Sequence, residues 1–543
     1  MNPTVYRNAK VLTGNPADPD RYAEAFAVQD GRFRSVGSLA EVRQSITEAP
    51  APLEIDLDGA VVIPGIVDSH SHLRQFGESL GHLELSGCDS LAGIQAAVRA
   101  AIAEAPERPR IIGKGWLFSA VPDGSPTAAM LDPVSGQTPV YLFANDFHSA
   151  WLNNAALLES GIDRETPDPV GGEIARDPAG AASGMLWENA FLELCLASLE
   201  RFKTTPGNAE DLRAAFSAYA ASGVTAAMDM SLAEADLEAL DMLLAEQDGV
   251  LPLRVRGYWL VTPAEDHAAH AAQIRRAAEL AANRKSPYFS VVGVKFIVDG
   301  VIDSCTAAMV EPFANGALPE AIWRAEYLAP AVVEADRAGL SIALHAIGDD
   351  ASRIALDALE SAVRSNGDIP RRHRLEHLET ITPENIERLV RLGVVASMQP
   401  VHADPAIQEN WRKMLGDHRI ERGYPLAEIE RAGARVALST DAPTASHRPF
   451  DNLYTAITRK SPGHPELPAN LPGMVISASR AFAYASYGGA YSCGQESEFG
   501  SIEAGKFADF TVLDRDPPAV PPEELLGIRV LLTVVGGLVS HRS

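Results

Sequence analysis

Eight short apolar segments recur through the middle of the chain, and alanine-rich stretches with helical periodicity separate most of them. The segments cover residues 65–72, 223–230, 253–261, 291–300, 341–349, 373–378, 393–400 and 434–442. Strands that are apolar on both faces are typical of parallel sheets covered by helices. Eight such strands with helical connections predict an α/β fold closed into a (β/α)8 TIM-type barrel over residues 65–442.

Both ends of the chain show a different pattern, in which short runs of alternating apolar and polar residues flank turn residues. EAFAVQDGRFRSVG near the start and GSIEAGKFADFTVLDRD near the end are examples. Alternation around Asp-Gly pairs is typical of hairpins. We therefore expect residues 1–64 and 443–543 to form a small β-sandwich built from both termini, together with a C-terminal segment.

The connection between the first and second barrel strands is far longer than a single helix requires. It contains strand-like runs such as PVYLF and a Gly/Pro/Asp-rich stretch, TPDPVGGEIARDPAGAASG. We expect residues 76–205 to form an inserted subdomain over the barrel mouth.

The predicted strands carry polar residues near their carboxyl ends, which is the end of a barrel where active sites lie. The first strand ends in His70 and His72, and side chains two apart on a strand point to the same side. Histidine and carboxylate side chains are the usual ligands of catalytic zinc. A lone histidine is more often a core residue, but five strands deliver such groups to one rim: His70 and His72, Lys295, His345, His377 and Asp441.

A purely structural role explains Lys295 less well than any other of these residues. Alternation places it with Ile297 and Asp299 on one face of its strand. Burial of an unpaired ammonium group destabilises a folded protein by about 3 kcal/mol or more. A lysine with a lowered pKa can react with carbon dioxide, and the resulting carbamate can bridge two metal ions.

These motifs resemble those of the amidohydrolase superfamily, and most closely its YtcJ-like branch, which includes N-substituted formamide deformylase. The resemblance rests on VVIPGIVDSHSH, GVKFIVDG, LHAIGD, RLEH, LSTDAP and the tail GSIEAGKFADFTVLDRD. It implies a site for one or two divalent ions, commonly zinc, with manganese as an alternative. By position, His70, His72 and Asp441 would hold the more buried ion, a carboxylated Lys295 would bridge, and His345 and His377 would hold the second. One segment, RAFAYASYGGAYSCGQE, departs from the branch, and we expect it to affect sandwich packing more than chemistry.

The resemblance implies an enzyme that hydrolyses C–N bonds other than peptide bonds: an amide, formamide, lactam or carbamate. The metal site would supply hydroxide as nucleophile. Asp441 would carry the proton from the water to the leaving amine, and His377 would help to polarise the carbonyl. Ester cleavage or ring deamination on the same site stays open, although deaminases of the superfamily usually lack the lysine. A non-catalytic barrel protein is a third reading, disfavoured because every ligand position is filled.

Five further residues are candidates for substrate contact. His148, Trp116 and Trp151 lie in the predicted insertion, where a tryptophan also serves commonly in packing. Gln399 and His402 follow the seventh barrel strand and so fall on the reactive rim.

Charge and cysteine content narrow the partners to a small-molecule substrate. The formal net charge of −26 argues against nucleic acid and anionic membrane surfaces. The four cysteines are widely spaced, which predicts no disulfide framework and a cytoplasmic location. No signal peptide or membrane span is expected, and the resemblance suggests a homodimer.

Overall fold

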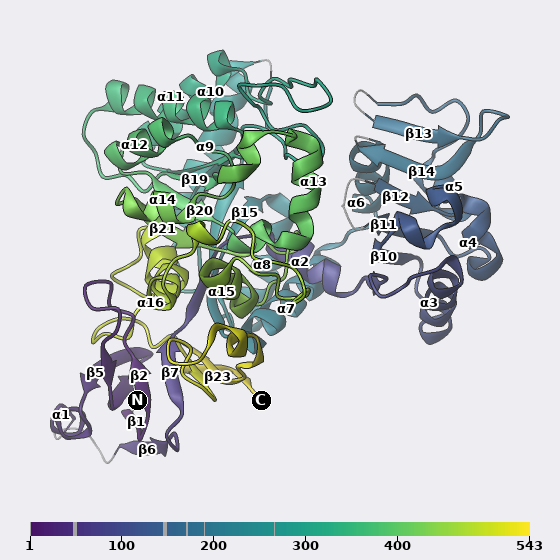
Figure 1. Ribbon diagram of the computed structural model, residues 1–543. Helices are drawn as coiled ribbons and strands as arrows, with labels where there is room; N and C mark the ends of the chain where they lie inside the picture. The colour runs from purple at the N-terminus through teal and green to yellow at the C-terminus, as the bar shows by residue number, and fades with distance from the viewer. Residues whose placement is uncertain (1, 47–51, 145–148, 170–171, 189, 265) are drawn as a thin grey trace. The chain divides into compact units, whose positions relative to one another are not determined.

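The computed structural model describes residues 2–543 except 47–51, 145–148, 170–171, 189 and 265 (Figure 1). Its chain divides into two compact units. One consists of Met1–Gly77 together with Ala209–Ser543, and the other of Glu78–Asn208. The two units are described separately below.

The centre of the first unit is a parallel sheet of eight strands in the order β21-β20-β19-β18-β17-β16-β15-β8. Its strands are β8 (Ile66–Ser71), β15 (Val224–Leu232), β16 (Arg254–Leu260), β17 (Phe289–Ile297), β18 (Ser341–Ala346), β19 (Arg374–His377), β20 (Val395–Met398) and β21 (Arg435–Leu438). Each falls on one of the eight predicted segments, so the TIM-type α/β prediction is confirmed. The first and last strands meet where the Asp441 N–H donates to the His70 carbonyl (2.9 Å) and the Ser69 hydroxyl to the Leu438 carbonyl (3.0 Å).

Amphipathic helices cover the barrel strands. Helix α12 (Pro383–Arg391) illustrates how the sequence determines one of them: the Thr382 hydroxyl accepts from the Asn385 N–H, and Pro383 occupies the first turn. A hydroxyl cap and an early proline both favour a helix start. The helix then buries Ile386 and Leu389, so its polar face remains outward.

The two ends of the chain pair with each other beside the barrel, as Figure 1 shows. Strand β7 (Val61–Pro64) pairs antiparallel with β22 (Phe510–Leu513), within a sheet of order β24-β23-β22-β7-β2-β3. The other strands of this sheet are β2 (Lys10–Leu12), β3 (Tyr22–Ala23), β23 (Val530–Val535) and β24 (Leu538–Arg542). A second sheet has the order β5-β4-β1-β6, with β1 (Thr4–Arg7), β4 (Ala25–Gln29), β5 (Arg32–Gly37) and β6 (Leu53–Asp56). Gly65 joins β7 to β8 directly, and a Cβ there would lie 2.0 Å from the Thr225 hydroxyl. Only glycine fits where the chain passes from sandwich to barrel.

The segment RAFAYASYGGAYSCGQE, which was expected to affect mainly the sandwich, lies against the barrel. Helix α17 (Gly489–Ser492) packs against interior residues at the amino ends of the strands. The Tyr258 hydroxyl donates to the Ser492 carbonyl (3.3 Å), and Arg374 donates to the Ser492 hydroxyl (3.0 Å). The expectation that this segment affects mainly sandwich packing is therefore wrong, because its small residues let it approach the barrel floor closely.

The second unit contains a sheet of its own, in the order β13-β14-β12-β11-β10-β9. Its strands are β9 (Leu83–Glu84), β10 (Ile111–Trp116), β11 (Val140–Ala144), β12 (Ser149–Leu152), β13 (Gly172–Arg176) and β14 (Ala182–Glu188). Two apolar clusters pack around this sheet. The predicted placement of this insertion over the barrel mouth stays a prediction. No helix in the described part of the chain is long and apolar enough to cross a membrane.

Candidate metal centre

Strand β8 presents His70 at the carboxyl end of the barrel, with 1% of the residue exposed. Its Nδ1 lies 2.7 Å from Oε2 of Glu376 on β19. A carboxylate beside Nδ1 fixes the proton on that nitrogen, so the Nε2 lone pair is available to a cation. His72 is oriented in the same way, because its Nδ1 lies 2.8 Å from the Ser231 hydroxyl.

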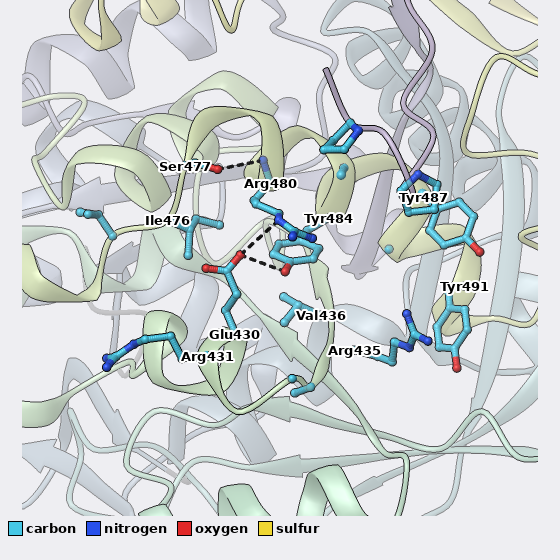
Figure 2. Close-up of a pocket in the computed structure, with 17 residues that line it drawn as sticks. Glu430, Arg431, Arg435, Val436, Ile476, Ser477, Arg480, Tyr484, Tyr487 and Tyr491 are labelled. Atoms are coloured by element: carbon cyan, nitrogen blue, oxygen red, sulfur yellow. Dashed lines mark hydrogen bonds and ion pairs between the residues drawn. The ribbon is translucent and has the colours of Figure 1, made fainter. Parts of the chain in front are cut away.

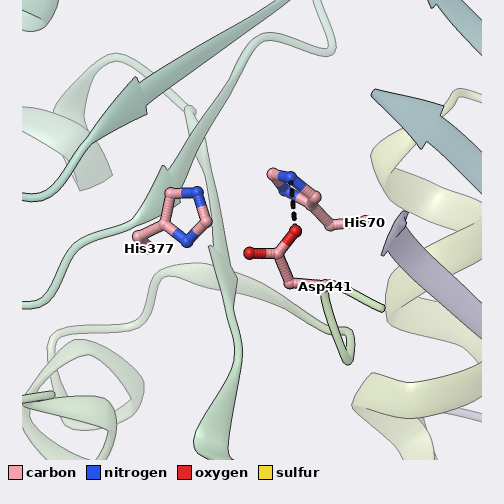
Figure 3. Close-up of side chains that lie close together, drawn as sticks. All are labelled: His70, His377 and Asp441. Carbon is pink, nitrogen blue, oxygen red and sulfur yellow. Dashed lines mark ion pairs between the residues drawn. The ribbon is translucent and has the colours of Figure 1, made fainter. Parts of the chain in front are cut away.

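Asp441 follows β21 and directs its carboxylate between the imidazoles (Figure 3). Its Oδ1 lies 3.3 Å from Nε2 of His70 and 3.2 Å from Nε2 of His72, yet no described residue donates a well-oriented hydrogen bond to this buried oxygen. The residue has a left-handed backbone, with φ of 59°. A non-glycine residue in that conformation is strained and is often found at a functional site.

His377 ends β19 and completes the group that Figure 3 shows. Its ring centroid lies 4.9 Å from that of His70 and 4.4 Å from that of His345. Its φ of 74° is also left-handed. None of the described residues hydrogen-bonds to its buried Nδ1, which is an atom that a cation could satisfy.

Lys295 and His345 reach the same centre from β17 and β18. The Lys295 ammonium lies 3.4 Å from Nε2 of His70 and is 2% exposed as a residue. His345 places Nε2 3.2 Å from the Gly300 carbonyl, so a neutral ring that donates there keeps its lone pair on Nδ1.

The spacing of these atoms fits a divalent ion. Ligands on a tetrahedral zinc with bonds of about 2.0–2.1 Å are separated by about 3.3–3.4 Å. The distances from Asp441 Oδ1 to the two Nε2 atoms, 3.3 and 3.2 Å, match that separation. Ligand atoms of His70, His377 and Asp441 all lie within 4.8 Å of one another. The residues present therefore suit the metal that their chemistry suggests.

Electrostatics keep the nitrogen ligands neutral and the carboxylate charged. Burial, helped by the charge of Lys295, lowers the pKa of His70 to about 4 and that of His345 to about 3. Burial also lowers the pKa of Lys295 to about 8. Burial raises the pKa of Asp441, but the neighbouring imidazoles outweigh it and hold that pKa well below its usual range. Neutral imidazoles and an ionised carboxylate are the forms that bind metals.

Sequence reasoning missed the residues that support the ligands. Glu376 accepts from His70 and is paired in turn with Arg374, and both side chains are completely buried. Arg374 also donates to the Ser69 carbonyl and the Ser397 hydroxyl. The sequence RLEH did indicate such residues, because Arg374 and Glu376 are two opposite charges on a buried strand and each needs a partner there.

His402 reaches the centre from the helical turn Pro400–Ala403, which follows β20. Its Nε2 is 3.8 Å from Asp441 Oδ2, and its Nδ1 is 3.8 Å from Oε1 of Glu379, a second carboxylate that the sequence did not single out. Its ring is nearly parallel to that of His377 at 6.1 Å. Gln399 is buried and donates to the Ser439 hydroxyl (2.8 Å).

The two tryptophans predicted to contact the substrate lie in the core of the second unit. Trp116 and Trp151 are fully buried in the core of the second unit. Their indole N–H groups donate to the carbonyls of Leu142 (3.0 Å) and Thr127 (2.9 Å), which favours packing over contact with a substrate. His148 lies outside the described residues.

Known proteins match this chain over nearly its whole length. The family model described as "Amidohydrolase family" matches residues 53–541. The chain is 30% identical to YtcJ of Bacillus subtilis, described as an amidohydrolase, over 95% of this chain and 96% of that one. It is 27% identical to N-substituted formamide deformylase of Arthrobacter pascens over 99% of both chains. The structure of an uncharacterized metal-dependent hydrolase from Pyrococcus horikoshii covers 96% of this chain and 99% of its own, with a TM-score of 0.79 and 23% identity.

Proposed function

The chain belongs to the amidohydrolase family of metal-dependent hydrolases, and from that premise we propose that it cleaves the C–N bond of a small amide, formamide, lactam or carbamate. The observation that carries the proposal is the position of Asp441. One of its carboxylate oxygens faces His70 and His72, and the other faces His402. The similarity to a formamide deformylase supports the same bond type.

His70, His72 and Asp441 would hold the more buried divalent ion, which we expect to be zinc or manganese. His345, His377 and a carboxylated Lys295 would hold a second. A divalent ion at such a site lowers the pKa of a coordinated water and polarises a carbonyl oxygen. The pKa of about 8 at Lys295 supports the carbamate, since an appreciable fraction of this amine is unprotonated near neutral pH and able to react with carbon dioxide.

Asp441 is the proton carrier in this proposal. As water adds to the substrate carbonyl carbon, its proton passes to the carboxylate of Asp441. The same carboxylate then gives that proton to the nitrogen as the C–N bond breaks, which yields an acid and an amine. A carboxylate with a strongly lowered pKa is ionised before each turnover, so it is ready to accept.

His402 would orient the substrate, and His377 would help to polarise its carbonyl. Nε2 of His402 lies 3.8 Å from Oδ2 of Asp441, and the His402 side chain retains 16% exposure. Glu379 lies behind Nδ1 of His402 and fixes the direction of the ring. His402 is therefore suited to contact the substrate beside the reacting carbonyl.

Zinc- and manganese-loaded protein should be screened against N-acyl amines, N-substituted formamides, lactams, carbamates and aryl esters, with product amine and acid measured directly. We expect amine release from at least one C–N class, and its loss in Asp441→Asn. Turnover of aryl esters without any C–N substrate, or release of ammonia from ring amines, would assign the site to ester cleavage or deamination instead. Metal analysis of the same samples separates a two-ion site from a one-ion site.

A further inference from the structure

A cavity lies at the other end of the barrel from the metal centre. Its volume is about 610 Å³, and it is formed by α14 (Leu426–Arg431), the start of β21 and the helical stretch from α16 (Ala478–Ala483) to α17 (Figure 2). Arg435 at the cavity begins β21, whereas Asp441 follows the opposite end of that strand. Binding sites for small molecules commonly have volumes of about 300–1,000 Å³.

Three tyrosines line one wall of this cavity: Tyr484, Tyr487 and Tyr491. The rings of Tyr487 and Tyr491 are stacked, with centroids 6.5 Å apart and 27° between planes. These tyrosines belong to one helical segment, RAFAYASYGGAYSCGQE, whose central turn is a π-helix from Tyr484 to Gly488. Short π-helical turns frequently occur at functional sites. A Cβ at Gly488 would lie 2.3 Å from the Val436 carbonyl oxygen, so the glycine lets this wall lie directly against β21.

The cavity is positively charged in a protein that is strongly negative. Its charged lining consists of Arg431, Arg435, Arg480 and a single acid, Glu430, whereas the whole chain carries a formal charge of −26. Glu430 already accepts from the Tyr484 hydroxyl (3.0 Å) and lies 3.9 Å from Arg480 Nε. Figure 2 shows both interactions.

Arg480 is thus paired with Glu430, whereas Arg435 is able to bind an anion in the cavity. Its guanidinium lies 5.3 Å from the Tyr491 ring centroid. Among the residues that the structure describes, it has no hydrogen-bond or ion-pair partner on its side chain, and it is exposed to the cavity. An arginine beside two stacked phenol rings offers charge-assisted hydrogen bonds to an anion and flat surfaces to an aromatic ring.

We propose that this cavity is a second binding site, for a small aromatic anion whose acidic group pairs with Arg435 and whose ring packs against Tyr487 and Tyr491. The site is independent of the proposed hydrolytic reaction, because its lining shares no residue with the metal centre. The acidic group is a carboxylate or a sulfonate, since the arginine fork fits both geometries.

The test compares 2-naphthalenesulfonate with the neutral 2-naphthalenemethanol, by calorimetry on the metal-loaded protein and by crystal soaking. A sulfonate is a poor zinc ligand, so binding at the metal centre is disfavoured. We expect the sulfonate to bind about tenfold or more tightly than the alcohol, and Arg435→Gln to remove about tenfold of that affinity. Arg431→Gln is the matched control, because that side chain points away from the tyrosines in Figure 2 and its Nε donates to the Ala427 carbonyl (3.0 Å).

Three results would overturn the proposal. The first is equal affinity for the sulfonate and the alcohol in the wild-type protein, a comparison that needs no variant to fold. The second is an unchanged affinity in Arg435→Gln, or an equal loss in Arg431→Gln. The third is density for the soaked compound at the metal centre or on the outer surface, with solvent alone in the cavity.

Discussion

Replacing Glu376 by glutamine tests whether the buried carboxylate behind His70 organises the metal centre. In the wild-type protein, Glu376 Oε2 lies 2.7 Å from His70 Nδ1, and the carboxylate is also paired with Arg374. A glutamine has nearly the same volume but keeps one acceptor oxygen. The glutamine oxygen can accept a hydrogen bond from the His70 imidazole or from the Arg374 guanidinium. In either case the glutamine NH2 group faces the other donor, which then lacks an acceptor.

Two quantities should change, with different magnitudes. Loss of a carboxylate that orients a histidine ligand typically lowers metal affinity by about 10- to 100-fold, or about 1.4–2.8 kcal/mol. Removing one partner of a buried ion pair costs about 3–5 kcal/mol, so the free energy of unfolding of the metal-free protein should fall by that order. Ser231→Ala removes a neutral partner of His72 and should lower metal affinity only several-fold, by about 1 kcal/mol.

Metal affinity is measured by competition with a fluorescent zinc chelator, and unfolding by urea titration of the metal-free protein. Glu360→Gln provides a control for the same chemical change, because Glu360 pairs with Arg388 near the surface of the barrel helices and should leave metal affinity unchanged. A folded Glu376→Gln protein whose zinc affinity is within twofold of wild type would refute the reasoning.

Further predictions concern turnover, metal loading and acid stability. Asp441→Asn should lower kcat by about 10²–10⁴ in protein whose metal content is verified by mass spectrometry, and a normal kcat with metal in place would exclude the proton-carrier role. His402→Asn should lower kcat/KM by about 10- to 100-fold, or about 1.4–2.7 kcal/mol, without changing metal content; lost metal would instead make His402 a ligand. Protein exposed to ¹³C-labelled bicarbonate should show a carbamate signal by NMR that Lys295→Gln abolishes, and persistence of the signal in the variant would place it elsewhere. Burial raises the pKa of Asp336, but hydrogen bonds from His373 and Arg371 outweigh burial and hold the pKa below its usual 3.8. The ionised carboxylate therefore stabilises the folded protein fully at pH values well above 3.8. This stabilisation is lost as the pH falls through the lower pKa of the folded state. Asp336→Asn should thus cost about 3 kcal/mol at pH 7 and less below about pH 4, as urea titrations at the two pH values will check; a difference independent of pH would contradict the charge effect.

The barrel could be predicted because its strands are short and apolar and are separated by helical stretches, and each predicted segment overlaps one observed strand. The convergence of His70, His377 and Asp441 followed from strand order alone, since the carboxyl ends of parallel strands share one rim. Their chemical assignment to particular ions and roles rests on the proposals above.

The supporting contacts could not be predicted, because they depend on register between distant strands. That Glu376 faces His70, while Arg374 reaches Ser492, follows from the pairing of β19 with its neighbours and from the packing of α17. The position of α17 could not be predicted either, because a run of Ala, Gly, Ser and Tyr shows no clear strand or helix periodicity. The packing roles of Trp116 and Trp151 likewise depended on the tertiary structure of the insertion.

The pairing of β7 with β22 has a consequence for the synthesis of this protein. All six candidate ligands have been translated once residue 441 is made, whereas the partner strand of β7 does not appear until residues 510–513. A nascent chain therefore carries a nearly complete barrel whose first strand, β8, continues directly from VVIP, a buried strand that can pair with β2 but still lacks β22 on its other edge. Such an exposed apolar edge is prone to association with other chains. While residues 441 to 513 are being translated, the apolar edge of β7 that will face β22 thus lacks its partner.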